Sequence, residues 1–132
     1  MVGALPRLLI LSDQREFACL MSVVAERLRF ATRILPHVLD LEYVMQHWRP
    51  DITAVHMAMA GNQDVEALEY LEGIGFAGRL LLTGDVSEKA LKEAAAVARS
   101  RGLDAAFVLT TQSPVDQVET ALRQLFGLER AA

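Results

Sequence analysis

The sequence contains a single cysteine, Cys19, so an internal disulfide is excluded. A lone thiol is typical of proteins kept in a reducing compartment, and we expect Cys19 to be buried beside the apolar stripe of a helix. The segment from Met1 to Leu11 lacks the layout of a signal peptide. No apolar run approaches the roughly 18 residues that a membrane-spanning helix needs. These absences predict a soluble, cytoplasmic protein with no membrane association.

Basic and aromatic residues are also scarce. The only lysines are Lys89 and Lys92, the arginines are scattered singly, and the net charge is −4. Aromatic residues make up 6% of the chain and form no ladder. Nucleic-acid binding usually relies on a basic patch with stacking aromatic residues. The sequence therefore predicts no direct nucleic-acid partner.

Catalytic motifs are missing as well. Gly73, Gly75 and Gly78 follow a predicted helix, whereas the glycines of a phosphate-binding loop open one. No nucleophile stands in a pattern that pairs it with a base. We therefore expect no enzymatic activity and no cofactor.

Apolar residues, by contrast, are abundant, at 52% of the 132 residues. This exceeds the roughly 45–50% of an average soluble protein. The excess fits a sheet whose two faces are both covered by helices. The length fits one domain, which we place at residues 1–132.

Short apolar runs alternate with helical patterns along the whole chain. The run from Ile52 to Met57 has no helical period and ends at a small-residue loop, which is typical of a fully buried central strand. The five predicted strands are 8–11, 32–35, 52–57, 79–83 and 105–109. Amphipathic segments follow each of them, and we expect the last helix to end at Gly127.

Residues that cap helices precede several of these segments. Ser12 or Asp13 is placed to cap the first helix, and Asp40 to cap the second. Asp85 and Glu88 have the spacing of a capping box before the fourth helix. In the third helix we expect Val65 to face the core, together with leucines one and two turns later.

Strands that alternate with helices predict a doubly wound α/β fold with a parallel five-stranded sheet and helices on both faces. In the strand order 2-1-3-4-5, the carboxyl ends of strands one, three and four meet at the switch point, where such sheets bind ligands. The residues at those ends are Ser12, Asp13, His56 and Thr83. We expect any chemistry of the protein to lie there.

These same residues resemble the pocket of response-regulator receiver domains, and the resemblance covers essentially the whole chain. In that family two acids follow strand one, a phosphoacceptor aspartate ends strand three, and a serine or threonine ends strand four. Ser12-Asp13 matches the acidic pair with one acid lost, and Thr83 matches the hydroxyl. His56 stands at the acceptor position, and Ala60 stands at a position that is usually proline. The resemblance implies a flavodoxin-like, CheY-like fold.

The family also carries a lysine after strand five. The matching position is Leu109, Thr110 or Thr111, and no lysine occurs anywhere after Lys92. Phosphorylation of the family's aspartate needs Mg²⁺, which prefers oxygen ligands, and imidazole is not one of them. Without the lysine, a phosphoryl group would also lack its cationic partner. We therefore interpret the chain as a pseudo-receiver that signals without phosphorylation on aspartate.

A finer resemblance runs from Leu81 through Gly84, Leu91 and Ala98 to Gly102. It is to receivers attached to EAL-type cyclic-di-GMP phosphodiesterases. Together the two resemblances imply a signalling protein as partner, either a histidine kinase or a protein of a cyclic-di-GMP pathway.

Each pocket residue has more than one interpretation. His56 could be phosphorylated, bind a metal or sense pH, but we favour an inert polar residue that fills the vacated pocket. No second histidine is placed to complete a metal site, because His37 and His47 belong to the second unit. Asp13 could hold a cation or orient His56, or it could only cap the helix.

The predicted partner surface lies on the fourth helix. Ala94, Ala95 and Ala96 are consecutive and span about 300° of arc, so at least one of them must point outward. Small side chains there would let a second helix approach closely. The family resemblance implies a homodimer through the fourth helix, fifth strand and fifth helix.

Two alternatives stay open. The chain could be a receiver that is phosphorylated on an unusual acceptor, or a sensor that binds a small ligand in the crevice of Asp13, His56 and Thr83.

Overall fold

A computed structural model describes residues 5–125. Its elements follow the predicted alternation, and each strand end differs from its predicted position by no more than one residue. The elements are β1 (Arg7–Leu11), α1 (Arg15–Arg27), β2 (Ala31–Leu35), the 3-10 turn η1 (Val38–Asp40), α2 (Leu41–His47), β3 (Ile52–His56), the 3-10 turn η2 (Ala60–Asn62), α3 (Gln63–Gly73), β4 (Arg79–Gly84), α4 (Glu88–Ser100), β5 (Asp104–Thr110) and α5 (Val115–Leu125). The predicted helix end at Gly127 lies outside the described residues.

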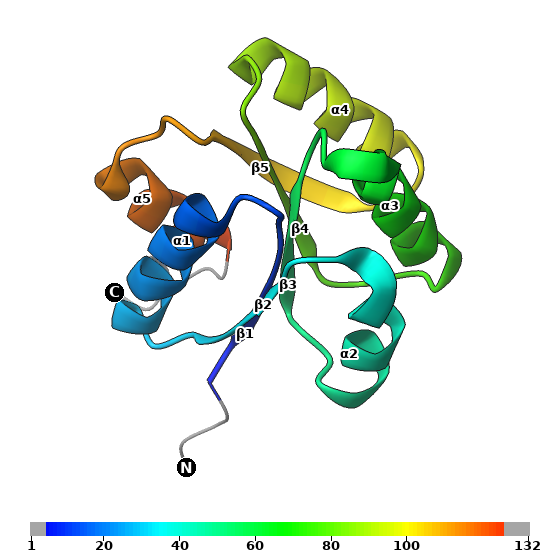
Figure 1. The fold of residues 1–132 in the computed structure, drawn as a ribbon, viewed down its shortest axis with the longest axis horizontal. Helices are drawn as coiled ribbons and strands as arrows, with labels where there is room; N and C mark the ends of the chain where they lie inside the picture. Colours follow the sequence, from blue (N-terminus) through cyan, green and yellow to red (C-terminus); the bar gives the residue numbers. More distant parts are fainter. Residues whose placement is uncertain (1–4, 126–132) are drawn as a thin grey trace.

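All strand pairs are parallel, and the sheet order is β2-β1-β3-β4-β5. Figure 1 views this sheet nearly edge-on, with α1 and α5 on one side and α2, α3 and α4 on the other. The predicted doubly wound fold with order 2-1-3-4-5 is therefore confirmed. Because the strands are parallel, their carboxyl ends share one edge of the sheet.

The two faces of the sheet have separate hydrophobic cores, because alternate side chains of a strand point to opposite faces. Leu9, Leu11 and Val55 pack toward α2, α3 and α4. Leu8 and Ile10 pack toward α1 and α5. All five residues of β3 are buried, as predicted for a central strand.

The first helix begins at a residue other than the two predicted, and the second has the predicted residue at its N-cap without the capping hydrogen bond. Gln14, rather than Ser12 or Asp13, holds the N-cap position of α1. The Ser12 hydroxyl instead accepts a hydrogen bond from the Gln14 backbone N–H at 3.0 Å, a local turn that competes with capping. Asp40 holds the N-cap position of α2, but its side chain makes no capping hydrogen bond.

The cap of α4 is Ser87, whose hydroxyl accepts a hydrogen bond from the Ala90 N–H at 3.1 Å, so the capping role predicted for Asp85 is wrong. Two predicted core positions are wrong as well. Cys19 is exposed, because the buried face of α1 passes through its neighbour Ala18. Val65 is 49% exposed.

Among the helices that the structure describes, none has both the length and the apolar character that crossing a bilayer requires.

Candidate functional site

His56 is the last residue of β3, and the strand register places it opposite Thr83 near the end of β4. Both side chains are almost completely buried, at 3% and 2% exposure. The imidazole Nδ1 lies 3.1 Å from the Thr83 hydroxyl oxygen, which is a hydrogen bond in either tautomer of the ring. The predicted meeting of the strand-three and strand-four tips therefore occurs, and the two side chains bond each other through Nδ1 and the hydroxyl.

Burial lowers the pKa of His56 below its ordinary value of 6.5, because desolvation disfavours the charged imidazolium. The carboxylates of Asp13, Asp85 and Asp64 act in the opposite direction, and their effect is smaller. The ring is therefore neutral at neutral pH. A neutral imidazole is a weak attractor of anions such as phosphate.

Asp64 is a buried residue of the first turn of α3. Its carboxylate accepts a hydrogen bond at 2.9 Å from the backbone N–H of Ala58. Ala58 has a φ of +64°, in the left-handed region that non-glycine residues rarely adopt. The carboxylate thus holds the loop after His56 in a strained shape. The only sequence signal for this role was an acid in the first turn of a helix.

The fifth strand brings no cation to the site. The register places Leu109 opposite Thr83 and Thr110 opposite Gly84. Thr111 comes next, and its hydroxyl donates to the Asp85 carboxylate at 3.3 Å, which links the loop after β5 to the loop after β4. Sequence reasoning gave Asp85 no part in this crevice.

These donors do not suit a magnesium ion. Asp13 is an exposed carboxylate, and His56 offers an imidazole nitrogen where a hard oxygen ligand would be needed. The Asp64 carboxylate already accepts the Ala58 N–H. Within residues 5–125, no group of three or more histidine, cysteine or acidic side chains is arranged to hold a metal.

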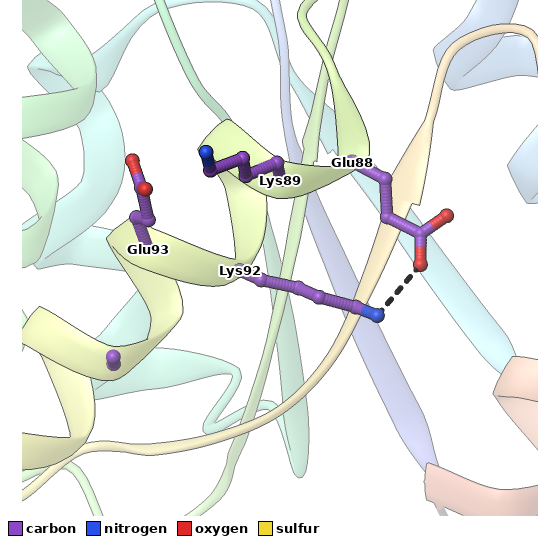
Figure 2. A pocket seen from close by; sticks show the side chains of 5 residues that line it. Glu88, Lys89, Lys92 and Glu93 are labelled. Atoms are coloured by element: carbon purple, nitrogen blue, oxygen red, sulfur yellow. Dashed lines mark ion pairs between the residues drawn. The ribbon is translucent and has the colours of Figure 1, made fainter.

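The predicted partner surface on α4 is only partly accessible. Ala96 is exposed and Ala94 is half-buried, but Ala95 is 2% exposed and belongs to the core, so it cannot meet a partner. Figure 2 shows the outer side of α4, where Lys92 pairs with Glu88 at 2.9 Å. Lys89, the other lysine of the chain, also lies on α4. Partner binding through this helix stays a prediction.

Comparisons with known proteins locate this chain by its fold. No protein-family model matches the sequence, and no curated protein matches it. Solved structures do match. A response regulator from Colwellia psychrerythraea has a TM-score of 0.79 and 19% identity, covering 92% of this chain and 96% of its own.

A CheY-like response regulator receiver domain protein from Methanospirillum hungatei has a TM-score of 0.74 and 12% identity, covering 97% and 99%. The BeF3-activated receiver domain of Klebsiella pneumoniae RstA has a TM-score of 0.73 and 15% identity, covering 90% and 97%. Each of these structures matches the fold of this chain over at least 90% of its length. The chain therefore has the fold of response-regulator receiver (CheY-like) domains.

Proposed function

We propose that this chain is a degenerate receiver domain that takes part in signal transduction through protein–protein contacts and is not phosphorylated on aspartate. The observation that carries the proposal is the buried hydrogen bond between His56 and Thr83, 3.1 Å long, at the switch point of the sheet. By the family resemblance, the acceptor carboxylate and the hydroxyl that binds the phosphoryl group would occupy these two positions.

The chemistry of this pair supports the proposal. Phosphorylation of a receiver domain on aspartate uses the carboxylate as the nucleophile and a divalent ion that the carboxylate helps to bind. A neutral imidazole at this position is not a carboxylate and is a poor ligand for such an ion. The Thr83 hydroxyl is hydrogen-bonded to the ring, so movement toward an incoming anion would break this bond. Lys89 and Lys92 belong to α4, and Lys92 is paired with Glu88.

If the domain is not phosphorylated, it can still transmit a signal by binding another signalling protein. A groove between α4 and β5 is lined by Lys92 and Arg99 of the helix and by Phe107 and Val108 of the strand. Such a mixed charged and apolar surface suits a partner helix or a second copy of the domain. We therefore retain a histidine kinase or a cyclic-di-GMP pathway protein as proposed partners, dimerisation through α4, β5 and α5 as a proposed assembly, and a cytoplasmic location as a prediction.

The test is incubation with acetyl phosphate and magnesium, followed by intact-mass spectrometry at neutral pH. An orthodox receiver domain in the same tube confirms that the donor is active. We expect the orthodox domain to gain a phosphoryl group and this chain to remain unmodified. A phosphoryl adduct located on Asp13, Asp64 or Asp85 would contradict the proposal.

The second candidate function is phosphorylation of His56, or ligand binding, at the crevice of Asp13, His56 and Thr83. The observation that favours it is that His56 bonds Thr83 through Nδ1, so Nε2 is the ring nitrogen that could accept a phosphoryl group or a ligand. An adduct on His56 in the same experiment, lost in a His56→Asn variant, would establish the first form. A rise in melting temperature with a nucleotide, cyclic dinucleotides included, would establish the second.

A further inference from the structure

Within residues 5–125, β2 is an edge strand of the sheet and pairs only with β1. The Ala31 N–H donates to the Pro6 carbonyl, and the Leu35 carbonyl accepts from the Ser12 N–H. In a parallel ladder, alternate residues direct their backbone groups to the same side. Ala31, Arg33 and Leu35 therefore face β1, whereas the N–H and C=O groups of Thr32 and Ile34 point away from the sheet. We call these outward groups the β2 edge.

Two arginine side chains near the β2 edge lie against Trp48, the residue that follows α2. The Arg33 guanidinium lies 5.1 Å from the ring centre of Trp48, and that of Arg7 lies 5.8 Å from it. Arg29 and Arg49 stand in the turns that precede β2 and β3, at the same end of the sheet. Within residues 5–125, none of these four arginines has an ion pair with a carboxylate.

Two nearby acids are engaged by other groups. Asp51 accepts a hydrogen bond at 2.8 Å from the backbone N–H of Arg7. Glu26 accepts a hydrogen bond from the Thr32 hydroxyl at 3.1 Å, on the α1 side of the sheet. These bonds come from neutral donors and leave both carboxylates charged, so this end of β2 has four arginines against two acids, a local positive excess in a chain whose net charge is −4. The local excess favours an acidic partner.

We propose that the β2 edge binds an extended acidic segment of a partner protein, which pairs with it as a sixth strand. Main-chain hydrogen bonds to Thr32 and Ile34 would supply affinity, and side-chain pairs across the strands would supply specificity. The surface is separate from the crevice at His56 and from α4, so the proposal holds whether or not His56 is modified.

The pleat of β2 determines which segments fit. Arg33 points toward Trp48, the residue that follows α2, on the same face as the core residue Leu35. Thr32 points toward α1, where its hydroxyl bonds Ser22, and Ile34 shares that face and is 39% exposed. A residue opposite Arg33 should therefore be acidic, and its two neighbours should be apolar. Alternating acidic and β-branched residues match this pattern.

A second copy of this chain is a poor occupant. If two β2 strands paired antiparallel over their full length, Thr32 would bond Ile34 of the other copy, and Arg33 would stand directly opposite its own equivalent. Like charges in that position repel. Registers centred on Thr32 or Ile34 avoid this contact, but they pair only part of the strand. The β2 edge therefore disfavours self-association and favours an acidic strand.

The first experiment uses a fluorescein-labelled peptide that alternates valine with glutamate, and a matched peptide that alternates valine with lysine. Anisotropy with the full chain should show saturable binding of the glutamate peptide only. The Arg33→Glu variant should bind the glutamate peptide about tenfold more weakly and should gain binding of the lysine peptide. Arg15→Glu, an exposed arginine at the opposite end of the sheet, is the matched control and should leave both affinities unchanged.

The second experiment tests strand pairing without altering the protein. Methylation of the peptide nitrogens that face β2 should abolish binding, whereas methylation of the alternate nitrogens should not. Amide hydrogen exchange should slow at Thr32 and Ile34 when the peptide binds. It should change little at Arg33, whose N–H already faces β1.

Three outcomes would overturn the proposal. The two peptides could bind equally well, both methylation patterns could have the same effect, or neither peptide could bind at peptide concentrations up to the millimolar range. Preferential binding of an anionic lipid vesicle or a single-stranded oligonucleotide, insensitive to Arg33→Glu, would also overturn it by assigning the surface to another class of partner.

Discussion

Replacing His56 by asparagine should remove an acid sensitivity of the fold. The asparagine amide can still reach the Thr83 hydroxyl from the position of Nδ1, but it does not titrate. Burial lowers the pKa of His56 in the folded state, so the unfolded chain binds a proton more readily than the folded chain does. Stability therefore rises with pH across the interval between the folded pKa and the unfolded value of 6.5.

The magnitude follows from proton linkage. Below 6.5, each pH unit can remove at most about 1.4 kcal/mol of unfolding free energy, until the folded pKa is reached. Between about pH 7.5 and about pH 5.5, His56 therefore contributes a loss of at most about 1.4 kcal/mol. The carboxylates of Asp13, Asp85 and Asp64 attract the imidazolium and reduce this loss. Asparagine should abolish it.

Urea unfolding followed by Trp48 fluorescence, over a series of pH values, measures the effect. The difference in unfolding free energy between the protein and its His56→Asn variant is the relevant quantity, because the titrations of His37 and His47 cancel in it. The difference should shift in favour of the variant as pH falls below 6.5. A difference that is independent of pH, or one that shifts in favour of the original protein, would refute the argument that His56 is buried and neutral.

Three further substitutions test the packing by chemical denaturation. The Thr53 hydroxyl is buried and has no hydrogen-bond partner among the described residues, so Thr53→Val should stabilise the fold by about 1 kcal/mol, and a loss of stability would reveal a missed partner. Arg79 donates to the last carbonyls of α5, those of Gln124 at 3.1 Å and Leu125 at 2.8 Å. Arg79→Met should therefore lower the free energy of unfolding by about 1 kcal/mol. An unchanged free energy of unfolding would mean that water bonds these carbonyls as well as the guanidinium does. Ala58→Gly should stabilise the fold by about 0.5 kcal/mol through relief of the positive φ, and destabilisation would show that the loop is not strained there.

Periodicity was sufficient to predict the sheet and the tips of its strands. A short apolar run without a helical period, such as the one from Ile52 to Met57, is typical of a strand buried on both faces, and parallel strands bring their ends to one edge. The approach of His56 to Thr83 followed from that topology. The pairing of their polar atoms did not, because it depends on side-chain rotamers that no pattern encodes.

The loops around the crevice were harder to predict, because their polar residues choose among several nearby donors. Asp85 has the spacing of a capping residue, yet Ser87 caps α4 and Asp85 bonds Thr111, which lies far away in the chain. The prediction of which side of the third helix is buried was also wrong at one position. In α3 the small residue Ala67 faces the sheet and Val65 faces outward, so the most apolar side chain was not the buried one.

The most direct test of the central claim is a titration with beryllofluoride and magnesium, which together mimic a phosphoryl group, followed by NMR. If His56 and Thr83 occupy the crevice by bonding each other, the backbone amide of Thr83 and the His56 ring should show no saturable change. Saturable shifts at Thr83 that spread into α4 would contradict the account, because they would show that the crevice still accepts a phosphoryl group and responds to it.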